Sequence, residues 1–143
     1  MSGVSVLRYL LANNAPLLAI VPATRILPGD LPLGTAFPAI AVKQIDGVPY
    51  KTIRTNETLK VHTDRVQVSV ICKAQQSAAT GTGYPGVTAL LKLVLAACPS
   101  QRGTVNSISV DSITPDIEGP DLPIPEVEAI TKSRDFFVRW VGA

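Results

Sequence analysis

The chain has 143 residues, of which 46% are hydrophobic and 17% are charged. This length suits one domain with a substantial core, and a charged fraction below the usual value of about 25% suggests that a partner covers part of the surface. Thirteen basic and eleven acidic residues leave a formal net charge of +2, and the basic residues are scattered, which argues against nucleic-acid binding as the main function.

Hydrophobic spacing predicts two helices at the beginning of the chain. Residues 3–12 place their apolar side chains on one helical face, with Ser2 as a plausible N-cap. Asn14 can cap a short second helix over 17–21, and Pro16 suits the first turn of a helix.

Strands are expected next, over residues 24–27 and 39–45. The second strand is followed by Asp46 and Gly47, a dipeptide that is typical of tight hairpin turns. We interpret residues 46–64 as an extended hairpin arm that stands off the core.

The second half of the chain is expected to contain three strands and one helix. Residues 65–73 alternate between polar and apolar side chains and form the clearest strand, and residues 87–98 carry an apolar helical stripe. Strands are also predicted over 104–113 and 133–142, separated by an acidic, proline-rich loop over 114–129. The predicted fold is a single α+β domain, with two or three helices packed on one face of a largely antiparallel sheet and an extended hairpin arm.

Cysteine usage and the apolar N-terminal segment bear on the cellular compartment. Cys72 and Cys98 fall on apolar faces and no C-x-x-C pair occurs, so buried free thiols in a reducing compartment are expected. Arg8, Asn13 and Pro16 interrupt the apolar N-terminus, so we expect neither a signal peptide nor a membrane span. The protein is therefore expected to be made in the cytoplasm.

Residues 81–86 read GTGYPG, which places three glycines at the G-x-G-x-x-G spacing of dinucleotide-binding loops. In such loops the first glycine directly follows a buried parallel strand. Here seven residues separate Lys73 from Gly81, and the preceding strand is polar on one face, unlike the strands of doubly wound sheets. We interpret the glycines as the start of a helix and expect no cofactor. A small dinucleotide-binding enzyme that uses this loop remains an alternative.

No other catalytic pattern stands out, because the chain lacks the P-loop, H-E-x-x-H and G-x-S-x-G motifs. The single histidine, His62, is expected to be a solvated residue of the arm rather than a general base. The acidic residues of the 114–129 loop could bind a hard cation, but the prolines between them favour a solvated loop. We therefore expect no enzymatic activity and no metal site.

Whole segments of the chain carry a resemblance to a known family. TRI occurs at 24–26, FPAI at 37–40, RVQVSV at 65–70 and DFFVRW at 135–140. In order and residue type, these segments resemble the tail-completion or tail-terminator family of long-tailed bacteriophages, also called head–tail joining proteins, over nearly the whole chain. The segment QQSAATGTGYPG is longer and richer in glycine than the family pattern.

The resemblance implies a small structural subunit that assembles into a ring, usually a hexamer. Such a ring contacts the tail tube protein at the end of the tube and offers its other face to the head–tail connector or neck protein. DNA passes through the lumen of the ring without sequence-specific binding. The implied location is the tail or neck of a virion assembled in the host cytoplasm. Another head–tail connector or neck-completion protein is the alternative, although such proteins tend to be more helical.

Polar residues of the arm, of the following strand and of the acidic loop are the candidate contacts with neighbouring subunits or with the tube. These connections are longer than the usual 4–6 residues or so, which is often a sign of function. The candidates are Tyr50, Lys51, Arg54, Lys60, His62, Arg65, Gln67, Asp116, Glu118 and Asp121.

Overall fold

A computed structural model of the chain describes residues 3–32, 34, 36–49, 60–73, 83–98, 103–120, 122–124 and 129–142. Within these ranges the helices are α1 (Gly3–Ala12), α2 (Ala15–Leu18) and α3 (Gly83–Ala97), with a 3-10 helix at Ala23–Arg25. The strands are β1 (Ile26–Pro28), β2 (Ala39–Pro49), β3 (Lys60–Lys73), β4 (Gly103–Val105), β5 (Ile108–Glu118), β6 (Leu122–Ile124) and β7 (Ala129–Gly142).

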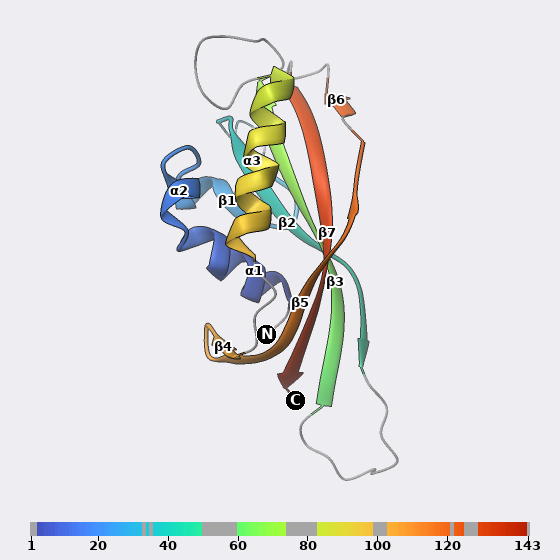
Figure 1. The fold of residues 1–143 in the computed structure, drawn as a ribbon. Helices are drawn as coiled ribbons and strands as arrows, with labels where there is room; N and C mark the ends of the chain where they lie inside the picture. The colour runs from blue at the N-terminus through green and yellow to red at the C-terminus, as the bar shows by residue number, and fades with distance from the viewer. Residues whose placement is uncertain are drawn as a thin grey trace.

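All the strands belong to one curled sheet in the order β1-β2-β3-β7-β5-β4, with β6 paired to β7 (Figure 1). Only β1 and β2 are parallel among these pairs. The predicted mixture of helices with a largely antiparallel sheet is therefore confirmed. The two longest strands, β3 and β7, are central and pair along their whole length.

The hydrophobic core lies where α1 and α3 contact the central strands, since both helices touch β3 and β7 (Figure 1). Val66, Val68 and Val70 on β3 are fully buried and alternate with partly exposed residues, as predicted. Phe136 and Val138 on β7 are also buried in this core. The alternation places Val66, Val68 and Val70 in the core and the side chains between them on the opposite side of β3.

Both cysteines are buried free thiols, which confirms the prediction from their apolar positions. Cys72 lies on the core side of β3, and Cys98 directly follows α3. Burial in apolar surroundings raises the pKa of each thiol to about 12. In the part of the chain that the structure describes, no helix has the length and apolar composition needed to cross a membrane.

Helix α1 forms over the predicted residues, whereas α2 covers Ala15–Leu18 rather than the predicted 17–21. Oδ1 of Asn14 accepts a hydrogen bond of 3.1 Å from the backbone N–H of Leu17, so Asn14 caps α2, which begins at Ala15 rather than at 17. The predicted strand over 24–27 is partly wrong, because Thr24 and Arg25 belong to the 3-10 helix and the strand begins only at Ile26.

The predicted turn at Asp46 and Gly47 is wrong. Strand β2 continues through both residues, which pair with Arg65 and Asp64 of β3 after a register shift just before Asp46. The shift leaves Ile45 as the extra residue of a β-bulge between Gln44 and Asp46. A Cβ atom on Gly47 would lie 2.7 Å from Oδ1 of Asp64, so the glycine permits a close approach between strands. The described parts of the predicted arm are therefore continuous with the sheet, and residues 50–59 lie outside the described residues.

The predicted single strand over 104–113 is also wrong, because β4 and β5 form a hairpin there. Its turn consists of Asn106 and Ser107, whose φ angles of 50° and 62° lie in the left-handed region. This geometry matches the two-residue turns that favour asparagine, although a glycine more often occupies the second position. The expected loop over 114–129 likewise begins as strand, since β5 reaches Glu118 and β6 pairs with β7.

Helix α3 begins at Gly83, four residues earlier than predicted. Gly83 and Gly86 therefore belong to the helix itself, while Gly81 lies outside the described residues. A dinucleotide-binding loop requires a strand that leads into the first glycine and a helix that starts after the loop. Gly83 and Gly86 do not fit such a loop, because they lie inside α3 and the helix does not start after them.

Candidate functional site

One side of the central sheet is rich in polar and charged side chains, and we call it the polar face. It is opposite to the side that carries Val66, Val68 and Val70. Cross-strand partners share a face in an antiparallel pair, so the pairing of β3 with β7 and the contacts below define its members. They are Arg65, Gln67, Asp116, Ser133, Asp135 and Phe137.

Arg65 is the centre of the polar face. Its Nη2 and Nε atoms donate hydrogen bonds of 2.7 and 2.9 Å to Oδ2 of Asp135, and Nη2 lies 3.7 Å from Oδ2 of Asp116. The hydrogen bond to Asp135 is the main cause of a raised pKa of the guanidinium, and the charges of Asp135, Asp116 and Asp46 contribute as well. Three strands, β3, β5 and β7, are thus joined by one cation held between carboxylates.

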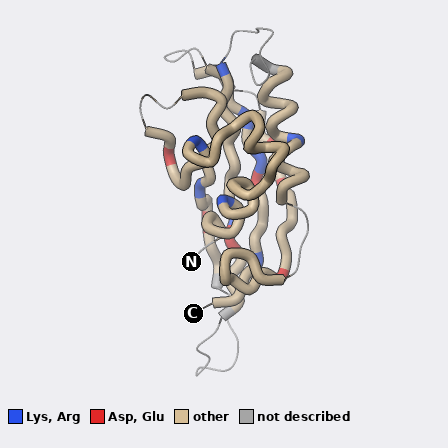
Figure 2. Tube along the Cα trace, turned by 90° about the vertical axis from the view of Figure 1, so that its left-hand side faces the viewer, with Lys and Arg blue, Asp and Glu red and all other residues tan. Residues whose placement is uncertain are grey.

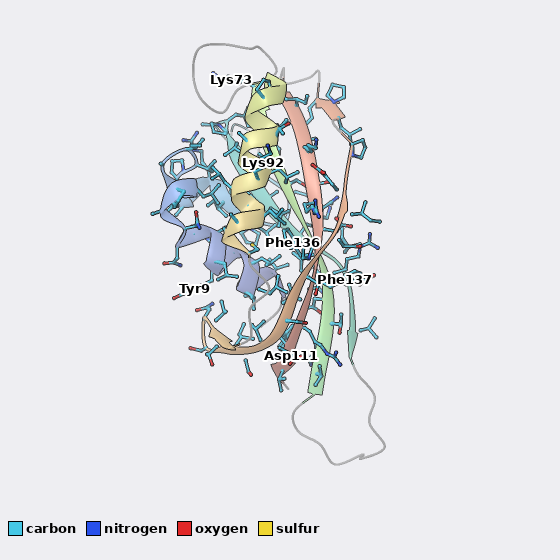
Figure 3. All side chains as sticks on the ribbon, in the orientation of Figure 1. Tyr9, Lys73, Lys92, Asp111, Phe136 and Phe137 are labelled. Carbon is cyan, nitrogen blue, oxygen red and sulfur yellow. The ribbon has the colours of Figure 1, made fainter. Side chains whose placement is uncertain are left out.

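The polar face continues along β3 and β7 beyond this ion pair. Nε2 of Gln67 donates a hydrogen bond of 3.1 Å to Oγ of Ser133, and the backbone N–H of Gly119 donates one of 2.8 Å to the carbonyl oxygen of Ser133. Phe137 lies beneath Arg65, with 5.9 Å from the guanidinium carbon to the ring centroid. Figure 3 labels Phe136 and Phe137, neighbours on β7, of which Phe136 belongs to the core.

Glu118 does not belong to the polar face, although the sequence analysis placed it with Asp116. Its carboxylate lies 3.4 Å from Nζ of Lys132 and 3.8 Å from Nη1 of Arg134. Arg134 pairs with Val68 and is therefore on the core side of β7. Glu118 and Arg134 form one wall of a pocket of about 160 Å³ beside α3, which is also lined by Thr88, Leu91, Lys92 and Leu95.

The prediction that His62 is a solvated arm residue is wrong. Its ring stacks on Trp140, with centroids 4.4 Å apart and an interplanar angle of 16°. The two residues are cross-strand partners on β3 and β7, which places them side by side. Nε2 of His62 is buried without a hydrogen-bond partner among the described residues. This packing makes His62 part of the sheet rather than an accessible base.

A buried carboxylate that the sequence analysis did not single out joins the first helix to the sheet. Oδ2 of Asp64 accepts hydrogen bonds of 2.8 Å from the backbone N–H of Gly3 and from Nε1 of Trp140. Because Gly3 is the first residue of α1, Asp64 satisfies a free N–H group of the helix from a strand far along the chain and complements the helix dipole. Ser2, the expected N-cap, lies outside the described residues.

The remaining candidates cannot be assigned a contact. Tyr50, Lys51, Arg54 and Asp121 lie outside the described residues, and Lys60 is described only through its backbone, which pairs with Gly142. Of the predicted site, the structure brings together Arg65, Gln67 and Asp116. Within the described residues, which include part of the predicted 114–129 loop, no group of three or more His, Cys, Asp or Glu side chains is arranged to hold a metal ion.

Asp135 is the polar-face residue that sequence reasoning missed. The signal was present, since Asp135 alternates with Phe136 and Val138 on a strand whose other side is apolar. Its position opposite Gln67 depends on the register between β3 and β7, which the sequence pattern does not determine. Figure 2 shows basic and acidic residues interspersed along the trace rather than gathered by sign.

The fold of this chain is similar to that of a protein of known structure. No family model and no curated protein sequence matches the chain. Among solved structures, a chain of the structure described as "Virion of native gene transfer agent (GTA) particle" has a similar fold, with a TM-score of 0.71 and 14% sequence identity. The similarity covers 99% of this chain and 96% of the other.

Proposed function

We propose that the chain is a structural virion protein, folded as one domain, that forms a ring at the end of a phage-like tail tube and joins the tube to the head–tail connector. The observation that carries the proposal is the similar fold of a virion chain over nearly the full length of both proteins. The resemblance of the TRI, FPAI, RVQVSV and DFFVRW segments to tail-terminator proteins supports the same role.

The chemistry of the polar face suits a structural role better than a catalytic one. The Arg65 guanidinium is engaged by Asp135 and Asp116, and the His62 ring is stacked on Trp140. A catalytic base must be within hydrogen-bond reach of its substrate, whereas Nε2 of His62 is buried. We propose that Arg65, Gln67 and Asp116 contact a neighbouring subunit or the tube through this face, and that the protein has no substrate.

The alternative within the same class is another connector or neck-completion protein. A chain of a whole virion structure is compatible with either role. The large antiparallel sheet favours the tail-terminator role, because connectors of this kind tend to be more helical.

The test is the solution mass of the purified protein by light scattering, followed by negative-stain imaging of any large species. A ring of six subunits with a central hole is the expected result, either for the free protein or after mixing with tail tubes. Failure to bind the ends of tail tubes would contradict the proposal. Caps at tube ends distinguish a tail terminator from a connector, which would not bind free tube ends.

A further inference from the structure

The sheet has two stretches of unpaired edge, one on each side. Strand β1 pairs only with residues 40–42 of β2, so residues 43–48 have no outer partner among the described residues. On the opposite side, β4 pairs only with residues 108–110 of β5. Residues 112–118, continued along β7 by β6, therefore also lack an outer partner in the described ranges. We call residues 43–48 the β2 edge, and residues 112–118 with 122–124 the β5 edge.

Exposed hydrophobic side chains concentrate on these two edges. Six large hydrophobic residues are well exposed in the described part of the chain, and four of them lie here. Ile45 and Val48 on the β2 edge are 48% and 63% exposed, and Ile117 and Leu122 on the β5 edge are 61% and 53% exposed. An unpaired strand edge with exposed apolar side chains is a template for pairing with another chain.

The two edges are complementary rather than equivalent. Pro115 and Pro123 lie in the β5 edge, and proline supplies no N–H donor. Two β5 edges facing each other would therefore leave carbonyl groups without donors. The β2 edge, KQIDGV, contains no proline and can supply donors. Charge also disfavours two β5 edges together, because each carries Asp116 and Glu118, whereas the β2 edge carries one cation, Lys43, and one anion, Asp46.

We infer that the β2 edge of one copy of this chain pairs with the β5 edge of the next copy. The two edges lie on opposite sides of one sheet, so the contact is heterologous, and repetition of such a contact closes into a ring when the rotation permits. The inference rests on the proposed ring and specifies how its subunits join. The polar faces of successive copies would then form one continuous surface.

Site-specific cross-linking tests this contact. The double variants Val48→Cys/Ile117→Cys and Ile45→Cys/Leu122→Cys are treated with a short flexible bismaleimide, which tolerates a small difference in register. Burial protects Cys72 and Cys98 from the reagent. The expected result is a ladder of covalent oligomers from at least one double variant, while each single variant stays monomeric on a denaturing gel.

The other outcomes separate this inference from the proposed function. Oligomers in light scattering without a ladder from either double variant would overturn the edge pairing and leave the ring in place. Covalent dimers from Val48→Cys alone would show that β2 edges pair with each other, which also overturns it. A protein that stays monomeric up to about 1 mM, where even very weak self-association is populated, and that gives no ladder when cross-linked on tail tubes contradicts the inference, while capping of those tubes would still support the proposed function.

A charged residue at the edge provides a second measurement, since charged side chains are a common device that keeps strand edges apart. Val48→Glu, which faces Asp116 and Glu118 of the β5 edge in the inferred contact, is expected to weaken self-association at least tenfold in sedimentation experiments. Tyr9→Glu is the matched control, because Tyr9 is also exposed but lies on α1, and the pocket that it lines includes no residue of either edge. Equal weakening by both variants would indicate a nonspecific effect and contradict the inference.

Discussion

Trp140 donates a hydrogen bond of 2.8 Å from Nε1 to Oδ2 of Asp64, and the same oxygen accepts the first N–H group of α1, from Gly3. Two strands and a helix thus meet at one carboxylate that is only 4% exposed. A buried acceptor that serves two donors is costly to remove, because both donors lose their partner away from water. The relationship explains why an acidic residue is found on the core side of β3.

Asp64→Ala is therefore expected to lower the free energy of unfolding by roughly 3 kcal/mol, since each unsatisfied buried donor costs about 1–3 kcal/mol. Urea denaturation measures this change, and Asp64→Asn, which keeps one acceptor oxygen, is expected to fall in between. Asp30→Ala is the control, because the Asp30 side chain is 88% exposed in its ion pair with Lys43 and should change stability by less than about 1 kcal/mol. Similar losses for Asp64→Ala and Asp30→Ala would contradict the structural role of Asp64.

Gly47→Ala is expected to destabilise the protein by about 1–3 kcal/mol, as small-to-large changes do in tightly packed places. The added Cβ would lie 2.7 Å from Oδ1 of Asp64, which its hydrogen bonds hold in place. In an Asp64→Ala background this obstacle is gone and only Nε2 of Gln44, the end of a flexible exposed side chain, would lie as close, at 2.8 Å, so the same substitution should cost less. Equal losses in both backgrounds would show that the close contact is not the cause.

Phe136 and Phe137 provide a matched pair on opposite sides of β7 (Figure 3). Phe136 is fully buried in the core, so Phe136→Ala is expected to cost about 3–5 kcal/mol in urea denaturation. Phe137 lies on the polar face beside Arg65 and is only partly buried, so Phe137→Ala should cost less than half as much. A reversed order would mean that the faces of β7 are assigned incorrectly.

The ion pair between Arg65 and Asp135 should make the effects of substituting these two residues on stability non-additive. Asp135→Asn is expected to lower the urea midpoint in the native background and to have a smaller effect in Arg65→Met, where the cation is already absent. Strictly additive shifts would contradict a shared interaction. Asp111→Asn, which alters a longer and more exposed contact with Arg139 on β7, should lower the midpoint less.

The thiols of Cys72 and Cys98 are expected to resist alkylation until the protein unfolds, because burial raises the pKa of both to about 12. In the unfolded chain these thiols ionise near the ordinary value of 9.0. The unfolded state therefore binds fewer protons above pH 9, so the contribution to stability is complete below this pH and is lost as the pH rises toward 12. Iodoacetamide labelling with and without urea measures the protection, and rapid labelling of the folded protein would contradict it.

Local patterns predicted those elements whose signal lies within the element itself. The alternation in RVQVSV identified β3, and the apolar stripe that contains Val87 and Leu90 identified α3. The Asp46-Gly47 turn failed because long-range pairing with Arg65 and Asp64 outweighed a local preference. The hairpin at Asn106 was missed because serine, not glycine, follows the asparagine.

The candidate site was predicted only in part for a related reason. Arg65 and Gln67 share a face because they are two positions apart on one strand, which the sequence shows directly. Asp116 and Glu118 have the same spacing, but a register shift between Pro115 and Glu118 places their side chains on different sides of the sheet. Such an irregularity, and the meeting of Asp135 with Arg65, depend on which strands become neighbours.

The central place of β7 has a consequence for synthesis of the protein. All fourteen residues of β3 pair with β7, and β5 and β6 reach the rest of the sheet only through it. On the ribosome, residues 60–73 emerge long before residues 129–142, so the edge of β3 that pairs with β7 stays without its partner for much of synthesis. We expect the nascent chain to remain without its tertiary structure, and dependent on protection from aggregation, until β7 leaves the ribosomal tunnel.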